Sequence, residues 1–154
     1  MKNKKLILGL PLVAVLGFGL LAFTGNSTVP EKVKTAFAKK FPNAKKIKWD
    51  KESETEWEAE FKMDGTEYSA NFLADGTWKE TEHEIKEKDI PAAVSATLKN
   101  AFSAYEIEEV EVVDSNQGQF YEFELEKGEE NLEVKIAATG TVIAKKLVDE
   151  EQED

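Results

Sequence analysis

The most restrictive feature of this sequence is a 13-residue pattern that occurs twice, 61 positions apart. Residues 29–41 read VPEKVKTAFAKKF and residues 90–102 read IPAAVSATLKNAF. Both segments begin with an apolar residue and a proline, and both then place apolar residues four positions apart. This spacing puts the apolar side chains on one side of an α-helix, and proline is well tolerated in a first helical turn. The sequence therefore predicts two amphipathic helices.

Local signals indicate where these helices begin and end. Thr28 and Glu31 have the spacing of a capping box at the start of the first helix. Asp89 is placed to cap the second helix. Pro42 is expected to end the first helix, because the residue before a proline is disfavoured in the α conformation.

Each predicted helix is followed by segments in which apolar and polar residues alternate. They are residues 55–63 and 67–74 in the first copy, and residues 120–126 and 131–138 in the second. A period of two is typical of an antiparallel strand with one buried face and one solvated face. We therefore expect strands, with their glutamates and lysines on the solvated face.

Glycine turns separate these strands at matching places. Asp-Gly at 64–65 and Lys-Gly at 127–128 join the middle strands, and Gly76 and Gly140 join the next pair. A tight reversal needs a residue that tolerates positive φ, which glycine does. From the middle strands onward the offset is 64, so the second copy has three extra residues. We expect them in a loop at 114–118, because insertions collect in loops.

Two more strands complete each copy. Residues 45–50 and 106–113 are candidates for the first strands, and the last strands begin with Trp78 and Val142 pointing inward. The predicted fold class is α+β, with the helices packed on one face of the sheet or sheets.

The predicted organisation is a tandem repeat of one helix followed by four antiparallel strands, with repeats at 29–88 and 89–148. Whether the repeats share one continuous sheet or pack edge to edge stays open. The residues expected in the two helix–sheet cores are Val33, Phe37, Trp57 and Phe61, and Val94, Leu98, Tyr121 and Phe123.

The arrangement of residues 29–82 followed by IPAAVSATLKNAF resembles the β-lactamase-inhibitor-like, PepSY-like domains of exported bacterial proteins. The apolar-Pro helix starts, the KKFP helix end and the Asp-Gly turn before Trp78 carry the resemblance. The second copy departs from it, with Ser103 in place of Pro42 and Thr139 in place of Asp75. The resemblance implies small non-catalytic modules that engage other proteins, sometimes as inhibitors of hydrolases, and it supplies no catalytic residues.

The two ends of the chain have compositions of their own. Three lysines lie in the first five residues, and residues 6–23 are apolar. This layout predicts a signal peptide over 1–27, with an uncleaved anchor as the alternative. The expected location is therefore periplasmic or secreted. Residues 149–154 are predicted to form a solvated acidic tail.

The charge of the chain narrows the class of partner. The sequence has 20 lysines, no arginine and 31 acidic residues, and residues 28–154 alone carry a net charge of −14. That charge disfavours binding to nucleic acid or to an anionic membrane surface. The chain has no cysteine, so disulfides, thiolate nucleophiles and Cys-ligated zinc are excluded.

Little else in the sequence indicates catalysis or a cofactor. His83 is the one histidine, and in its acidic surroundings it is either a solvated strand residue or a metal ligand with Glu82 and Glu84. With one histidine and no cysteine, no conventional nucleophile–base pair is available. We therefore predict a protein that is not an enzyme, with no cofactor and no metal site.

The residues best placed for an interaction lie on the outward side of the predicted strands. Charged side chains dominate there, and two apolar side chains interrupt them. We expect this surface to bind another protein of the envelope or exterior. Weak calcium binding by diffuse carboxylates is the alternative. The predicted surface residues are Glu58, Glu60, Lys62, Leu73, Phe120, Glu122 and Glu124.

Overall fold

The computed structural model describes residues 28–148, so the predicted leader (1–27) and acidic tail (149–154) lie outside the described residues. Helices and strands follow one another as two stretches of one helix and four strands. The elements are α1 (Glu31–Lys40), β1 (Lys45–Lys51), β2 (Glu56–Met63), β3 (Thr66–Leu73), β4 (Trp78–Glu84), the 3-10 turn η1 (Glu87–Asp89), α2 (Ala92–Ala101), β5 (Glu106–Ser115), β6 (Gly118–Lys127), β7 (Glu130–Ala137) and β8 (Val142–Val148).

The strands form one continuous sheet. All eight are antiparallel and lie in sequence order from β1 to β8, so each strand pairs with its neighbour in the chain. The halves meet where β4 pairs with β5, with Glu82 opposite Val113. The predicted α+β class is confirmed, and the open question of sheet continuity is answered.

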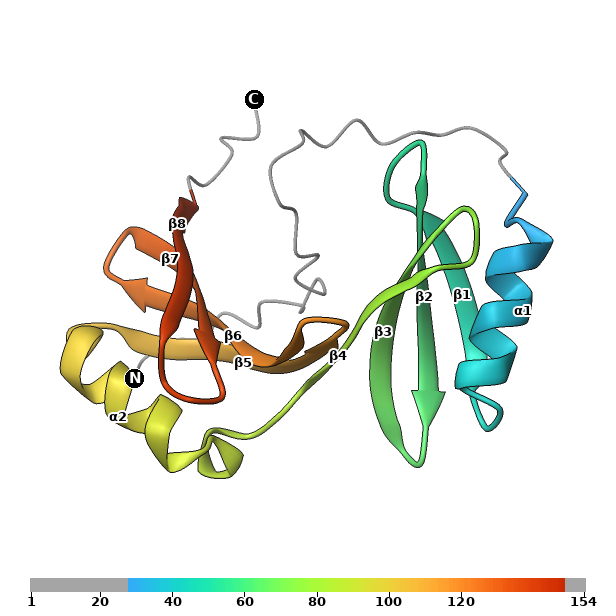
Figure 1. Cartoon of the computed structure of the whole chain (residues 1–154). Coiled ribbons are helices and arrows are strands. Elements are labelled where there is room, and N and C mark those ends of the chain that lie inside the picture. The colour runs from blue at the N-terminus through green and yellow to red at the C-terminus, as the bar shows by residue number, and fades with distance from the viewer. Residues whose placement is uncertain (1–27, 149–154) are drawn as a thin grey trace, which may run out of the picture.

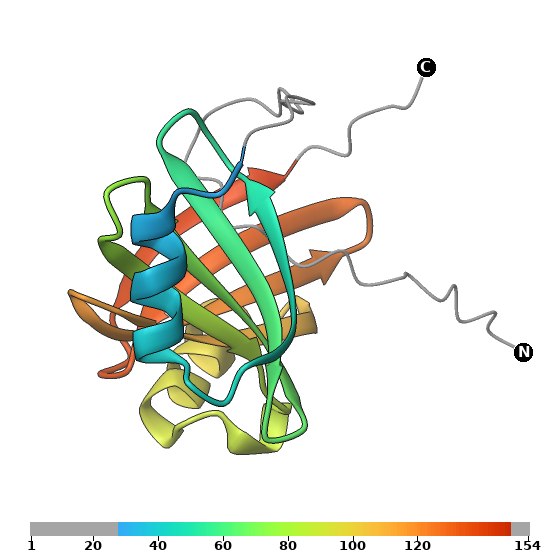
Figure 2. The same ribbon diagram turned by 90° about the vertical axis from the view of Figure 1, so that its right-hand side faces the viewer.

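Both helices lie on the outer side of this bent sheet (Figure 1). Helix α1 covers the strands of the first half and α2 covers those of the second, as the view from the side of α1 also shows (Figure 2). The opposite side of the sheet carries neither helix. We call it the open face and define it by the side chains that alternate with the core residues, such as Glu58 and Glu60 on β2 and Glu122 and Glu124 on β6.

The first core is dominated by aromatic rings. Phe37 of α1 lies edge-on to Phe61 of β2, with ring centroids 5.0 Å apart, and edge-on to Trp49 of β1 at 5.1 Å. Val33 and Trp57 are buried in the same cluster. The predicted first core is therefore confirmed. Edge-on aromatic pairs of this kind are favourable beyond the apolar area that they bury.

The second core is mostly aliphatic. Val94 and Leu98 of α2 pack with Tyr121 and Phe123 of β6, as predicted. Phe123 is fully buried. The two cores use different side chains for the same task, because shape and volume matter more than residue type when an amphipathic helix covers a sheet.

The turns after β3 and β7 touch the helices directly. Gly76 has a φ of +92°, and a Cβ atom built on it would lie 2.8 Å from the carbonyl oxygen of Lys32 in α1. Gly140 has a φ of +87°, and its Cβ would lie 2.8 Å from the carbonyl oxygen of Ala93 in α2. Glycine is therefore required twice over at these turns, for its positive φ and for the close approach of the helix.

The predicted helix caps are wrong. Pro30 and Pro91 occupy the N-cap positions, and neither helix has a side-chain capping hydrogen bond. Asp89 lies in the 3-10 turn instead. The reason is that the residue before a proline is held extended, which carries Thr28 and Asp89 away from the first helical N–H groups.

Two further strand predictions are corrected. Val142 lies on the core side of the sheet, opposite the buried Ile136, but it is 38% exposed and is not part of the core, because β8 is an edge strand. Trp78, by contrast, packs against the first core. The three extra residues of the second copy do not form a loop. They lengthen the β5–β6 hairpin, in which Ser115 pairs with Gly118 across a two-residue turn.

Within residues 28–148, no helix has the length and apolar character needed to cross a membrane.

Candidate functional site: the open face of the sheet

The predicted interaction residues lie on the open face but in two groups. Glu58, Glu60 and Lys62 are on β2, where they alternate with the core residues, and Leu73 ends β3. The remaining three lie on β6, separated from the first group by β4 and β5. They are Phe120, Glu122 and Glu124. The sequence therefore identified the two flanks of this face and missed its centre.

The solvation predicted for two of these residues is wrong. Glu58 and Glu122 are only 3% and 4% exposed. Glu60, Lys62, Leu73, Phe120 and Glu124 are half-buried. An inner strand has a neighbour on each side, so side chains of adjacent strands cover one another even where no helix lies above them.

Glu82 on β4 and Glu111 on β5 occupy the missing centre. They are 4% and 7% exposed, and they lie on adjacent strands, diagonal to one another, because Glu82 pairs with Val113 and Glu84 pairs with Glu111. Together with Glu58 and Glu122 they form what we call the central carboxyl cluster. The alternation within TEHE and EVEV indicated their side of the strand, but only the β4–β5 pairing brings them together.

The four carboxyl groups differ in their partners. Ser69 donates a hydrogen bond from its hydroxyl to Glu58. Lys135 of β7 donates to Glu122, with 2.5 Å between Nζ and Oε1. In contrast, Oε2 of Glu82 and Oε2 of Glu111 are buried without a hydrogen-bond partner. Buried polar atoms without partners are rare in native proteins, so each one needs an explanation.

Burial raises the pKa of every member of this cluster. The pKa of Glu82 rises from 4.5 to about 9, mainly because of burial and then because of repulsion from Glu111 and Glu122. The pKa of Glu111 rises to about 8 and that of Glu58 to about 7, again with burial as the main cause. Burial also raises the pKa of Glu122, although the hydrogen bond and charge of Lys135 oppose it.

It follows that Glu82 and Glu111 hold protons at neutral pH. A low-dielectric site disfavours the ionised form, and so does a nearby carboxylate. An approaching cation would reverse both effects and release the protons. The chemistry available at the centre of the open face is therefore the exchange of protons for a positive charge.

Lysines neutralise carboxylates around this centre. Lys48 pairs with Glu60 at 3.1 Å, and Lys79 pairs with the half-buried Glu56 at 2.7 Å. The first pair joins the adjacent strands β1 and β2, and the second reaches from β4 across β3 to β2. Partly exposed ion pairs contribute little to stability, so their main effect here is to reduce repulsion at the rim while leaving the centre acidic.

His83 belongs to the opposite side of the sheet. It is half-buried, with its ring 4.8 Å from that of Tyr68, and burial lowers its pKa. It therefore points away from Glu82 and Glu84 and does not join them as a ligand. Within residues 28–148, no three His, Cys, Asp or Glu side chains are arranged to hold a metal ion.

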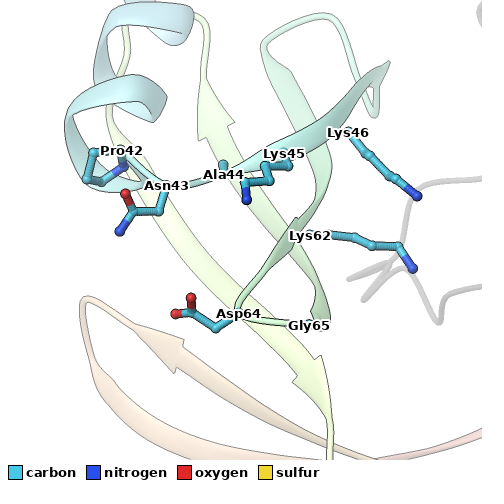
Figure 3. Close-up of a pocket in the computed structure, with 8 residues that line it drawn as sticks. All are labelled: Pro42, Asn43, Ala44, Lys45, Lys46, Lys62, Asp64 and Gly65. Atoms are coloured by element: carbon cyan, nitrogen blue, oxygen red, sulfur yellow. The ribbon is translucent and has the colours of Figure 1, made fainter.

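A depression of about 540 Å³ lies at one end of the first half, between the α1–β1 connection and the β2–β3 turn (Figure 3). Lys46 and Lys62 extend in one direction and Asp64 in another, so their charges do not converge (Figure 3). Lys62 is also paired with Glu67 at 2.5 Å. This depression is a less convincing site than the open face.

One contact of the cluster can be tested alone. Replacing Ser69 with alanine is expected to raise the pKa of Glu58 further, because the Ser69 hydroxyl stabilises its ionised form. We expect a loss of about 1 kcal/mol of unfolding free energy at a pH above that pKa, where the carboxylate is charged. NMR titration of the Glu58 carboxyl carbon and denaturant unfolding would measure both effects. An unchanged Glu58 pKa would contradict the role given to Ser69.

Comparison with known proteins identifies the family of this chain. The chain matches the family described as "Putative beta-lactamase-inhibitor-like, PepSY-like" over residues 24–67 and 55–144. The match covers well over half of the chain, so the protein belongs to this family. No curated protein sequence matches the chain significantly.

Solved structures share the fold at low sequence identity. A BLIP-like protein from Bacteroides fragilis has a TM-score of 0.73 at 21% identity, with 85% of this chain and 94% of that chain covered. A DUF2874 family protein from Bacteroides uniformis has a TM-score of 0.74 at 19% identity, with 80% and 93% covered. A Bacteroides eggerthii protein described as a "putative periplasmic" protein has a TM-score of 0.73 at 20% identity, with 82% and 94% covered.

Proposed function

We propose that this protein is an exported, non-catalytic module that binds another protein through the open face of its sheet. The observation that carries the proposal is the pair of buried, unpartnered carboxyl groups of Glu82 and Glu111 at the centre of that face. A fold gains no stability from such groups, so their presence is better explained by a partner that supplies what they lack.

Charge gives the chemistry of the partner. The open face is acidic at its centre, and residues 28–154 carry a net charge of −14. A partner with a basic, protruding surface is therefore favoured, because charge complementarity raises the association rate and selects the partner. Leu73 and Phe120, half-buried at opposite flanks, supply apolar contact area around the acidic centre.

Family membership supports the same class of function. The family description and the BLIP-like structure both refer to an inhibitor, and a concave or bent sheet without helices on one side suits the task of covering another protein. We therefore propose that the partner is an envelope or secreted protein, and that inhibition or modulation of an enzyme is the consequence of binding. The apolar leader expected at 1–27 and the periplasmic description of one relative support an exported location.

We further propose that the two halves are copies of one unit, 29–88 and 89–148, each of one helix and four strands. The equivalent positions of Gly76 and Gly140, each with its Cβ direction 2.8 Å from a helix carbonyl oxygen, support this. A duplicated unit with a shared sheet places its junction, and hence Glu82 and Glu111, at the middle of the binding face.

Affinity capture from the native cell envelope tests the binding surface. Because Glu58 and Glu122 are buried, the charge reversal is confined to Glu60 and Glu124, which are half-buried at the rim. We expect E60K/E124K to weaken capture of the partner about tenfold or more through lost charge complementarity. Quantitative mass spectrometry of the bound proteins would measure the change.

A matched control keeps the same net charge. E54K/E129K alters two exposed residues in turns away from the centre of the open face. This variant should capture the partner as well as the unmodified protein does. Equal losses in both variants would assign the effect to net charge alone, and no loss in either would overturn the open face as the binding surface.

A further inference from the structure

Two buried carboxyl groups at the junction of the halves lack the hydrogen-bond partners that neighbouring carboxyl groups have. Glu82 and Glu111 are more than nine-tenths buried, and each carries one carboxyl oxygen without a hydrogen-bond partner. On the same face, Glu122 has Lys135 and Glu58 has Ser69. The two residues lie diagonally on the same face of adjacent strands, a spacing at which one group can contact two long side chains.

We infer that Glu82 and Glu111 form a binding site for one lysine side chain of the partner protein, whose ammonium group inserts between their carboxyl groups. The inference rests on the proposed function and gives the chemistry of the residue that anchors the partner.

The surroundings of the two carboxyl groups favour a cation. Acidic side chains of β2, β4, β5 and β6 surround them, and the ammonium of Lys135, which reaches the cluster, is occupied by Glu122. Ser69 and Asn71 donate to Glu58 and Glu56. The acidic neighbours are Glu80 and Glu84 on β4, Glu109 on β5, Glu58 on β2, and Glu122 and Glu124 on β6.

Lysine is favoured over other cations. The protein itself pairs carboxylates of this face with lysine, as in the 2.5 Å contact of Lys135 with the buried Glu122 and the 2.7 Å contact of Lys79 with the half-buried Glu56. An ammonium has three donors, enough for two single oxygens on separate strands. A metal ion is disfavoured, because no suitable group of three ligands occurs within residues 28–148.

The site is reachable without any change in the fold. Neither helix covers this face of the sheet (Figure 1). Glutamate side chains can rotate about three bonds, so a change of rotamer at Glu82 and Glu111 brings their oxygens to an arriving ammonium. The long apolar stem of lysine suits such a site, since it can be buried while the charged end is paired.

Lysine binding at this site must release protons. Both carboxyl groups are protonated at neutral pH, with pKa values of about 9 and about 8. One ammonium balances one negative charge, so one proton leaves to solvent and the two carboxyl groups share the other. Because one proton is released, the affinity increases about tenfold for each unit by which the pH is raised, as long as the pH stays below these pKa values.

The test uses a tripeptide, N-acetyl-Gly-Lys-Gly-amide, titrated into the protein between pH 6 and 8. We expect the side-chain carboxyl carbons of Glu82 and Glu111 to shift in NMR spectra toward their ionised positions. The affinity should rise by about tenfold per pH unit. Calorimetry in two buffers of different ionisation enthalpy should detect the released proton.

Three matched comparisons make the outcome decisive. The norleucine tripeptide, which lacks only the charged group, should not bind, and E82Q/E111Q should lose the response to the lysine tripeptide. E54Q/E129Q alters two exposed glutamates in turns away from the site and should keep it. A response to norleucine, or an undiminished response in E82Q/E111Q, overturns the inference. Binding of free putrescine without binding of the tripeptide would assign the site to a small polyamine and overturn the protein source.

This experiment separates two kinds of failure. If the tripeptide fails while E60K/E124K still weakens capture, the open face binds a partner without a lysine at its centre. If the tripeptide binds while capture is unaffected by E60K/E124K, the lysine site is present and the proposed extent of the binding surface is wrong.

Discussion

Replacing Glu82 with glutamine is expected to make the protein more stable, by about 3 kcal/mol at pH 7 as an upper estimate. Glutamine has almost the shape of a protonated carboxyl group and keeps a donor and an acceptor, but it has no charge to lose on burial. The gain arises because glutamate at position 82 must take up a proton when the chain folds at neutral pH. Its pKa is about 9 in the folded protein and near 4.5 when exposed.

The pH dependence of this gain gives the sharper test. Below pH 4.5 the carboxyl group is protonated in both states, so E82Q and the unmodified protein should differ little. Between pH 4.5 and pH 9 the folded state binds more protons than the unfolded state, so the unmodified protein loses stability as pH rises. The advantage of E82Q should therefore grow with pH and level off near pH 9. Urea unfolding at several pH values would measure it.

E84Q is the matched control for this prediction. Glu84 lies two residues away on the same strand and the same face, but it is exposed. Surface substitutions of this kind change stability by about 0.5 kcal/mol or less. A destabilised E82Q, or a gain independent of pH, would contradict the raised pKa of Glu82 in the folded protein.

Replacing Gly76 with alanine is expected to cost about 2 to 4 kcal/mol of unfolding free energy, one of the largest losses available from adding a single methyl group. Two effects add together. Alanine is strained at a φ of +92°, and its Cβ would lie 2.8 Å from the carbonyl oxygen of Lys32, a backbone atom that cannot move aside without moving α1. G140A should behave alike, since its Cβ meets the carbonyl oxygen of Ala93.

Gly65 separates the two effects. Its φ of +90° is almost the same, but no atom lies within 4 Å of a Cβ built there. G65A should therefore cost about 1 to 2 kcal/mol, the strain alone. The difference between the stability losses of G76A and G65A measures the cost of the contact between the turn and the helix. Equal losses in G76A and G65A would contradict a direct contact between turn and helix.

Much of the fold could be predicted because its determinants are local. The four-residue spacing of Val33 and Phe37 selects one face of a helix, and the alternation of Trp57 and Phe61 selects one face of a strand. The apolar face of the helix and the apolar face of the sheet are both buried by packing against each other. These residues were therefore expected to form one core, and they do. The glycine turns were predictable for the same reason, since positive φ is a property of a single residue.

The candidate site could not be predicted in full because burial there is a property of neighbouring strands. Period-two alternation tells which side of a strand Glu58 or Glu122 occupies, but not whether adjacent side chains cover it. Glu82 and Glu111 are distant from each other in the chain and meet only through the β4–β5 pairing. The predicted burial of Val142 was wrong for a related reason. Its position in the alternation is that of a core residue, but it lies on an edge strand and is exposed.

The stability predicted for E82Q bears on function. Natural proteins often keep a locally unfavourable group where it is needed for binding or catalysis. The carboxyl group of Glu82 is neutral in the free protein and becomes ionised when a cationic partner binds. It therefore favours a cationic partner over a neutral one. By the same reasoning, E82Q should be the more stable protein and the poorer binder.

The strict succession of strands across the sheet has a consequence for how quickly the chain reaches its native state. Every strand pairs with the strand next to it in the chain, and β4–β5 is the one pairing that spans a helix within residues 28–148. Few distant segments must find each other, so the contact order is low for a β-rich protein and the entropy lost in closing loops is modest. Refolding from denaturant should accordingly be rapid for so β-rich a chain.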